Sequence, residues 1–225
     1  MAVRWVELSQ PLFNGMPRAK AHGEVKFWVD KLPLPSAKGE SEVCITHMEM
    51  ATHVGTHIDA ARHMVPGAPT IDQYPLERFV GPAVVLDVRR EGIVQLTADE
   101  LRKAKPAIQP GDIVLFYFGY ADRFHDESYY SHPYLSNDAA DFLVERKVNV
   151  VGTDTVTPDL PGIARPPGFD FPVHIRFFTN DILIIENLGM GLKEVLNKRV
   201  TAAVVPFRIE GGDASPITAL AMVEE

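Results

Sequence analysis

Three histidines and one aspartate lie close together in this sequence, at His53, His57, Asp59 and His63. Because the whole chain has 8 histidines, this short segment holds a large share of them. Imidazole and carboxylate groups are ligands that zinc, manganese and iron prefer, and two histidines with one aspartate leave positions open for water and substrate. The segment therefore predicts a divalent-metal site on His53, His57 and Asp59 that supports metal-dependent hydrolysis.

The backbone of this segment must bend for the three side chains to converge. On an α-helix, His53 and His57 share a face, but Asp59 points about 240° away from His53 around the axis. On a straight strand, His53 and His57 lie about 13 Å apart, at roughly 3.3 Å per residue. Gly55 tolerates positive φ and permits a bend, and the Thr56 hydroxyl can brace it. We predict the end of a strand folded around a metal ion.

The position of His63 leaves its role open. It can be a further ligand, transfer protons as a general acid or base, or lie at the rim of the site, and we favour the acid/base role. The histidines outside the cluster are expected to be hydrogen-bonded core residues, namely His22, His47, His125 and His132.

A second pair of candidate ligands comes later in the chain. His174 lies on a predicted short helix that begins at Pro172, and Glu186 directly follows the apolar strand 182–185. A carboxylate at that point is costly to bury without a partner. Glu186 therefore either reaches solvent at the strand end or binds a cation or a base, and the spacing alone does not decide.

Strands and helices alternate through the middle of the chain. Ser136 is expected to cap a helix over 138–146, and Thr97 and Glu100 form a capping box for residues 101–104. This alternation predicts an α/β fold with parallel pairing, and the strand-rich N-terminal part adds antiparallel or mixed sheet. Buried strands are predicted at 83–88, 113–118, 148–152, 182–185 and 202–207, with further strands at the N-terminus and over 43–51.

Two long segments read as loops, at 119–134 and 153–172. Long loops in a compact domain often carry function. The first is rich in aromatic residues, which either line a pocket for a planar substrate or pack the loop onto the surface; these residues are Tyr120, Phe124, Tyr129, Tyr130 and Tyr134.

The composition bounds the class of protein. The 225 residues include 46% hydrophobic and 23% charged residues, which predicts one globular domain over 1–225. The net charge of -8 disfavours nucleic-acid and membrane-surface partners and leaves a small-molecule substrate. No apolar run approaches the roughly 18 residues of a membrane span. Cys44, the single cysteine, is expected to be a small buried residue in a cytoplasmic protein.

The segment His53-x-Gly-Thr-His57-x-Asp59-x-x-x-His63 resembles the signature of the cyclase family, which includes bacterial kynurenine formamidase and isatin hydrolase. The resemblance extends to residues 71–77 and 151–155 and to the pair His174 and Glu186, so it covers most of the chain. One position departs from the family pattern, because Ala61 stands where the family commonly has proline. That departure loosens the local backbone and bears on the strict formamidase branch more than on the metal site.

The resemblance implies both a fold and a site. The fold is a single compact α/β domain with a mixed β-sheet flanked by helices, of the swivelling β/β/α kind, assembled as a homodimer or homotetramer. His53, His57 and Asp59 would hold a first metal, and Asp59, His174 and Glu186 a second, so that Asp59 bridges. The cofactor would be zinc or manganese, with one or two ions per chain. His63 would handle protons beside the metal.

The activity implied by the resemblance is hydrolysis of a small amide by a metal-activated water. The substrate would be an aryl formamide such as N-formylkynurenine, or a cyclic amide. Two alternatives stay open: a metal-dependent cyclase or lyase acting on a small carbonyl compound, because a fold does not fix chemistry, and a non-catalytic metal-binding protein.

Overall fold

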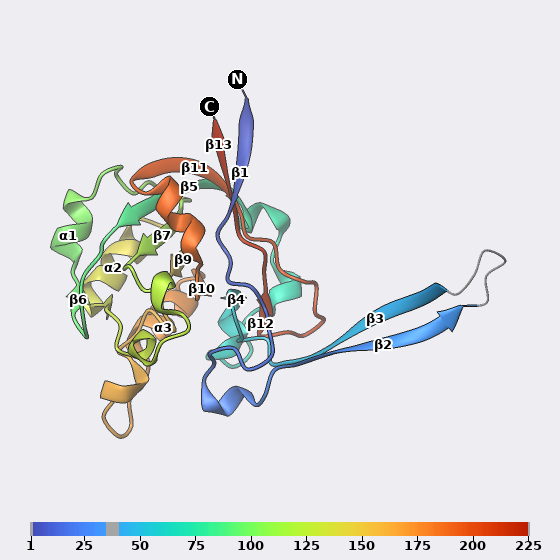
Figure 1. The fold of residues 1–225 in the computed structure, drawn as a ribbon. Coiled ribbons are helices and arrows are strands. Elements are labelled where there is room, and N and C mark those ends of the chain that lie inside the picture. The colour runs from blue at the N-terminus through green and yellow to red at the C-terminus, as the bar shows by residue number, and fades with distance from the viewer. Residues whose placement is uncertain (1, 35–40, 225) are drawn as a thin grey trace.

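A nine-stranded mixed sheet is the framework of the chain (Figure 1), in a computed structural model that describes residues 2–34 and 41–224. Its strands run in the order β1-β13-β11-β5-β7-β9-β10-β4-β12, and two pairs, β2 with β3 and β6 with β8, lie outside it. The strand bounds are β1 Val3–Glu7, β2 Lys26–Leu34, β3 Ser41–Glu49, β4 His57–Asp59, β5 Val80–Asp87, β6 Gln95–Leu96, β7 Ile113–Tyr117, β8 Tyr134–Leu135, β9 Val150–Thr153, β10 Leu183–Glu186, β11 Lys198–Ala203, β12 Ala214–Pro216 and β13 Leu220–Glu224.

The central strands β5, β7, β9 and β10 are parallel and mostly buried. One face of the sheet packs against the α-helices, and the curled sheet end and the 3-10 helix η8 (Met190–Val195) cover the other. Strands buried on both faces read as continuous apolar runs, which is why the sequence located them. The predicted α/β fold with a mixed sheet is confirmed.

Three α-helices lie side by side on one face of the sheet (Figure 1): α1 (Ala98–Lys103), α2 (Asn137–Glu145) and α3 (Pro172–Thr179). The predicted capping box of Thr97 and Glu100 is present, and the Ser136 hydroxyl accepts the amide hydrogen of Ala139. No helix within residues 2–34 and 41–224 is long and apolar enough to cross a membrane.

The strand predicted over 202–207 is displaced in the structure. β11 ends at Ala203, and beyond it Val205 and Phe207 are 43% and 56% exposed. The prediction followed apolar residues, but β11 begins with the exposed pair Lys198 and Arg199 and is only partly buried. Because β11 begins with exposed polar residues, the apolar pattern did not indicate where this strand starts.

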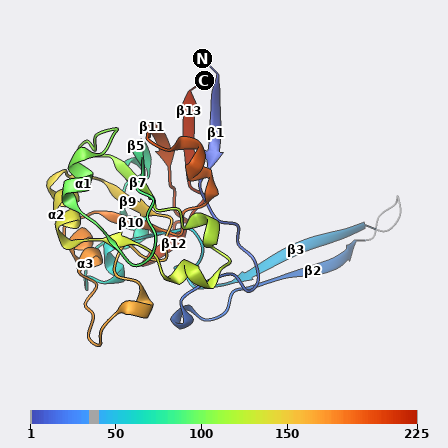
Figure 2. The ribbon, with the colours of Figure 1, turned by 60° about the vertical axis from the view of Figure 1, so that its left-hand side comes forward.

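Strands β2 and β3 form a hairpin, called the arm below, that projects away from the sheet in two views (Figures 1 and 2). Cys44 lies on β3 and is exposed, so its predicted burial is wrong. The reason is that the arm has no core beneath it, although it carries apolar residues on both faces. Those that are exposed are Trp28, Val29, Leu32, Leu34, Val43, Ile45 and Met48.

A buried carboxylate organises the aromatic loop 119–134. Asp154, at the end of β9, accepts hydrogen bonds from the backbone N–H groups of Phe118, Gly119, Tyr120 and Ala121, at 2.7 to 3.0 Å. Tyr129 of the same loop is buried and donates to the Asn187 side chain. The loop is thereby held against the sheet. Short 3-10 helices shape this and other connections: η1 Lys20–His22, η2 Ala61–His63, η3 Ile71–Gln73, η4 Leu76–Arg78, η5 Ala121–Arg123, η6 Glu127–Tyr130 and η7 Gly162–Ala164.

Although burial raises the pKa of Asp154 to about 6, we predict that Asp154→Asn destabilises the protein by about 3 kcal/mol, because the new amide N–H faces a backbone donor and leaves that donor buried and unpaired. Urea unfolding measures the change. The matched control is Asp126→Asn, an exposed aspartate that accepts one backbone N–H, from Ser128. Equal losses in the two variants would contradict this assignment.

Candidate metal centre

The predicted bend between His53 and His57 is confirmed. Gly55 has φ 67°, in the left-handed region, and a Cβ there would lie 2.6 Å from Cδ2 of Leu12. Thr56 braces the bend as expected: its hydroxyl accepts the N–H of Gln10 and donates to the carbonyl of Asn187.

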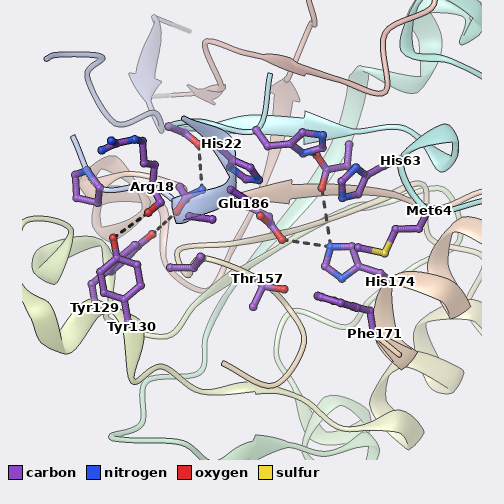
Figure 3. A pocket seen from close by; sticks show the side chains of 18 of the residues that line it. Arg18, His22, His63, Met64, Tyr129, Tyr130, Thr157, Phe171, His174 and Glu186 are labelled. Atoms are coloured by element: carbon purple, nitrogen blue, oxygen red, sulfur yellow. Dashed lines mark hydrogen bonds and ion pairs between the residues drawn. The ribbon is translucent and has the colours of Figure 1, made fainter. Parts of the chain in front are cut away.

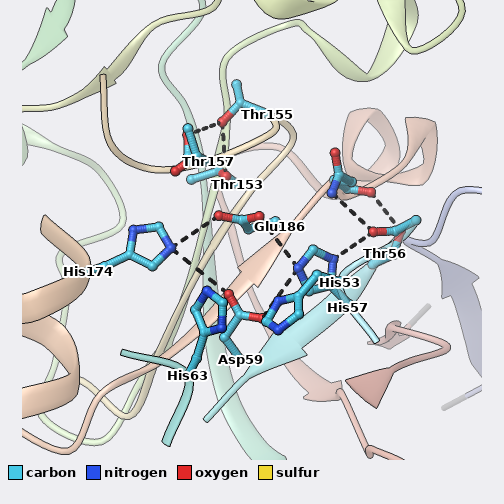
Figure 4. Close-up of polar contacts among 12 residues, drawn as sticks. His53, Thr56, His57, Asp59, His63, Thr153, Thr155, Thr157, His174 and Glu186 are labelled. Carbon is cyan, nitrogen blue, oxygen red and sulfur yellow. Dashed lines mark hydrogen bonds and ion pairs between the residues drawn. The ribbon is translucent and has the colours of Figure 1, made fainter. Parts of the chain in front are cut away.

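The bend brings the side chains of His53, His57 and Asp59 together (Figure 4). Oδ1 of Asp59 lies 2.8 Å from Nδ1 of His53 and 3.3 Å from Nε2 of His57. Asp59 and His57 are 1% exposed. Nδ1 of His57 donates to the Gly55 carbonyl at 2.9 Å, which leaves its Nε2 facing the carboxylate.

His174 and Glu186 join Asp59 from the other side (Figure 4). In the antiparallel pairing of β10 with β4, Glu186 is directly opposite His57, so the two share a face of the sheet. Nε2 of His174 lies 3.3 Å from Oε1 of Glu186 and 4.0 Å from Oδ2 of Asp59. Of the two alternatives for Glu186, the structure supports the second: its side chain is buried beside His57 and His174 rather than exposed to solvent at the strand end.

The nitrogen and oxygen atoms of this cluster are suitable ligands for a divalent metal ion. Nε2 of His57 and Oδ1 of Asp59 are buried without a hydrogen-bond partner, although they lie 3.3 Å apart. The ligand atoms of His53, His57 and Asp59 lie within 4.8 Å of one another, and so do those of Asp59, His174 and Glu186. Asp59 belongs to both groups, which is the arrangement expected of a bridging carboxylate.

Asp159 is a carboxylate that contacts the ligand candidate His174, and the sequence did not identify it. It accepts from Nδ1 of His174 at 2.6 Å and from the backbone N–H groups of Val173 and His174. It therefore both fixes the ring of His174 and satisfies the first turn of α3. Its place in a loop rich in proline and aspartate gave no signal that distinguished it.

Asp213 is the corresponding carboxylate on the other side, and the sequence did not identify it either. Oδ2 of Asp213 accepts from Nε2 of His53 at 2.9 Å and lies 3.3 Å from Nδ1 of His63. Oδ1 of Asp213 accepts a further hydrogen bond from the Thr52 hydroxyl. Carboxylates in this position orient a ligand histidine and raise its basicity.

The charges within the cluster shift its titrations. Burial acts to lower the pKa of His174, but hydrogen bonds to Asp159 and Glu186 outweigh it and raise the pKa to about 10. Against the same burial, Asp59 and Glu186 raise the pKa of His57. Burial acts to raise the pKa of Asp59, but the neighbouring histidines hold it well below its usual range.

His63, on η2, lies beside the other imidazoles. Its ring centroid is 4.0 Å from that of His53, and its side chain is 24% exposed. Burial is the largest influence on His63 and lowers its pKa. Near neutral pH the ring is therefore uncharged and able to accept a proton. With His53 and Asp213 it also forms a third group of ligand atoms within 4.8 Å, so its acid/base role stays a prediction.

The backbone next to Ala61 has a shape that proline at this position would also accept. Ala61 is the first residue of η2, a position where proline is well tolerated, and Ala60 before it is extended, with φ -90° and ψ 159°.

The other histidines divide. His132 is a buried core residue as predicted, with Nδ1 2.8 Å from the Pro133 carbonyl oxygen, and burial lowers its pKa to about 4. The prediction is wrong for the other three. His125 is exposed, His47 lies on the arm in an ion pair with Asp30, and His22 is half-buried in the wall of the metal-site cavity.

A cavity of about 380 Å³ opens beside the cluster (Figure 3). Tyr129 and Tyr130 of the aromatic loop line it, whereas Tyr120 and Phe124 are buried in the core. Residues of the loop therefore both line a cavity and pack the loop against the core, and a planar substrate for that cavity stays a prediction. Phe171 and Arg165 lie in the wall near His174.

Known proteins resemble the chain over most of its length. The family model named Cyclase, described as "Putative cyclase", matches residues 6–160. A kynurenine formamidase of Salinibacter ruber is 30% identical over 192 residues, covering 80% of this chain and 81% of the relative. Isatin hydrolase A of Labrenzia aggregata, solved with benzyl benzoate, has a TM-score of 0.83 at 25% identity, covering 99% of this chain and 94% of that one. A potential metal-dependent hydrolase with cyclase activity has a TM-score of 0.78 at 27% identity, covering 100% of both chains.

We predict that metal binding at pH 7 releases protons and weakens as the pH falls. In the metal-free protein the raised pKa values of His57 and His174 keep both rings protonated at pH 7, and a ligand nitrogen must lose its proton. Isothermal titration calorimetry of Zn²⁺ and Mn²⁺ in buffers of different ionisation enthalpy counts the protons, and we expect at least one per ion. A binding enthalpy independent of the buffer would contradict this prediction.

Proposed function

The chain belongs to the cyclase family, and from this premise we propose that it is a metal-dependent hydrolase that cleaves a small amide. The observation that carries the proposal is the pair of ligand groups that share Asp59 beside an open cavity. A non-catalytic metal protein has no need of that cavity, and a hydrolase has no need of a Ser or Cys nucleophile when water attacks.

We propose zinc or manganese as the cofactor, with His53, His57 and Asp59 holding one ion and Asp59, His174 and Glu186 able to hold a second. When bound, such an ion supplies Lewis acidity, which lowers the pKa of water towards neutrality and polarises a carbonyl oxygen. Asp159 and Asp213 keep the rings of His174 and His53 in the orientation that presents their free nitrogens.

His63 is proposed to move the proton. With Nδ1 directed at Asp213, its Nε2 is left to accept a proton from the attacking water. Its lowered pKa favours the neutral form that this step requires. The same nitrogen then returns the proton to the leaving nitrogen of the amide, which would otherwise have to depart as an amine anion.

The proposed substrates are an aryl formamide such as N-formylkynurenine, or a cyclic amide. Two named relatives support these two classes, one a kynurenine formamidase and the other an isatin hydrolase. The cavity volume of about 380 Å³ and the rings of Tyr129, Tyr130 and Phe171 suit a single planar aromatic molecule. The rival activity within the family is a cyclase or lyase reaction at the same metal, which an assay with aryl formamides and cyclic amides separates from hydrolysis.

We also propose that the chain forms a homodimer or homotetramer in which another copy covers the arm. Leu32 is paired directly with Val43, and Trp28 and Ile45 share that face, while Val29 and Met48 occupy the opposite face. A two-stranded hairpin alone is at best marginally stable in water. A partner that is always present would stabilise the arm, and a second copy of the chain meets that condition.

We predict that Asp59→Asn loses both metal and activity, whereas His63→Ala keeps the metal and loses at least about 100-fold in kcat, the usual scale of general acid/base catalysis. Metal content of the purified variants and turnover of aryl formamides measure the two effects. His125→Ala, an exposed histidine, is the control. Full metal content in Asp59→Asn would exclude the shared carboxylate, and loss of metal in His63→Ala would make His63 a ligand.

We predict that a double substitution of Leu32→Lys and Ile45→Lys lowers the molar mass in solution to that of one 24.9 kDa chain, because charges in an apolar interface are costly to desolvate. Light scattering after size-exclusion chromatography gives the mass. Met190→Lys, which replaces an apolar residue 48% exposed on the body, should leave the oligomer intact. A monomeric wild type, or an oligomeric double variant, would exclude this role of the arm.

A further inference from the structure

Arg165 is a half-buried arginine in the wall of the metal-site cavity, and it has no carboxylate partner among the described residues. Several other arginines of this acidic chain have such partners, whereas Arg18 in the same cavity wall has none among the described residues; the paired ones include Arg78, Arg89, Arg90, Arg123, Arg176 and Arg199. A guanidinium that is removed from water without an anion needs an explanation.

The side chain of Arg165 is held in place by contacts that do not involve its two Nη groups. Nε donates to the Leu160 carbonyl at 2.7 Å. The guanidinium carbon lies 4.3 Å from the ring centroid of Phe171 and 5.3 Å from that of Phe169. These contacts fix the plane of the guanidinium and leave both Nη groups as free donors.

Phe171 connects this guanidinium to the metal centre. It directly precedes α3 and has φ 52°, a left-handed conformation that is unfavourable in a residue other than glycine. In this conformation its ring centroid lies 5.9 Å from that of His174. Figure 3 shows the two side chains in the same wall of the cavity. The strained backbone therefore places one ring between the guanidinium and a metal-ligand candidate.

The nearby carboxylates are already engaged. Glu186 and Asp159 both act on the titration of Arg165, but each contacts His174 instead, at 3.3 and 2.6 Å. Burial remains the largest influence on the group and lowers the pKa of Arg165. An anion that enters the cavity would compensate this loss of hydration.

We propose that Arg165 binds a carboxylate of the substrate, so that the enzyme prefers an aryl formamide or cyclic amide that carries a carboxylate separate from the bond it cleaves. This proposal rests on the proposed amide hydrolysis and deepens it. A planar guanidinium with two free Nη donors matches a carboxylate in a two-pronged hydrogen bond.

The test compares substrates that differ only in charge. The 2-, 3- and 4-formamidobenzoates are paired with the formamidobenzamides of the same substitution pattern, which have a neutral group of nearly the same shape. With the metal-loaded wild type we expect kcat/KM to favour the anion by at least tenfold in one of the three pairs. In Arg165→Met that preference is lost, with kcat/KM falling about 10- to 100-fold on the anion and less than twofold on the amide.

Two further variants and one control sharpen the result. Arg165→Lys keeps the positive charge but not the pair of Nη donors in one plane, so it should retain only part of the preference. Arg146→Met is the control, because Arg146 also stacks on a phenylalanine, at 5.0 Å from the Phe142 ring centroid, but is exposed outside the cavity. Arg18 lines the same cavity and likewise has no carboxylate partner among the described residues, so Arg18→Met tests whether the preference belongs to Arg165 in particular.

Loss on the anion and the amide alike in Arg165→Met, no preference in the wild type, or loss of the preference in Arg18→Met would each overturn the proposal. If the wild type cleaves none of the six compounds, the proposed amide hydrolysis fails by itself. Calorimetric binding of benzoate to metal-loaded wild type and Arg165→Met then decides the role of Arg165. A carboxylate that only ligates the metal binds both equally, whereas the proposal requires at least tenfold weaker binding in the variant.

Discussion

The Asp59 carboxylate is 1% exposed, and a carboxylate so deeply buried must be compensated by hydrogen-bond donors or by positive charge. The surrounding residues meet this condition in two ways. In the metal-free protein, protons on the imidazoles of His53 and His57 provide the charge, which is why the pKa values of both rings are raised while that of Asp59 is lowered. A divalent ion can take the place of those protons. The charge of Asp59 is therefore balanced either by protons on the histidines or by a metal ion, and metal binding is accompanied by proton release.

Segments far apart in the sequence supply this balance. The three-residue strand β4 lies between β10 and β12, and its antiparallel register sets Glu186 against His57. The first turn of α3 brings His174, with Asp159 holding both the ring and the helix N-terminus. Asp213, just before β12, supports His53 in the same way. Each ligand candidate is thus fixed by an element whose position depends on the core of the sheet.

The sequence contained the local part of this arrangement. His53, His57 and Asp59 are close in the chain, and the bend at Gly55 follows from the geometry that their convergence requires. Buried parallel strands and capped helices were also visible, because burial on both faces and N-terminal capping leave direct marks in the residue order. Asp159 and Asp213 left no such mark, since each acts through contacts with residues distant in the sequence.

The exposed arm was invisible for a different reason. An alternation of apolar and polar residues predicts a strand, but it does not say whether anything lies against the apolar face. The sequence therefore predicts a strand around Cys44 but does not indicate that β3 has no core beneath it.

The base of the arm is nevertheless part of the site. Val25 just before β2 is buried in the core, and Phe27 and Met50 pack against the same cluster. On one side the chain leads back from Val25 to His22 in the cavity wall, and on the other it leads from Met50 to His53. The two ends of the hairpin continue into the cavity wall and the first ligand candidate. In the proposed oligomer, a second copy that covers the arm would therefore contact a hairpin that is joined to the site by a few residues of backbone on each side.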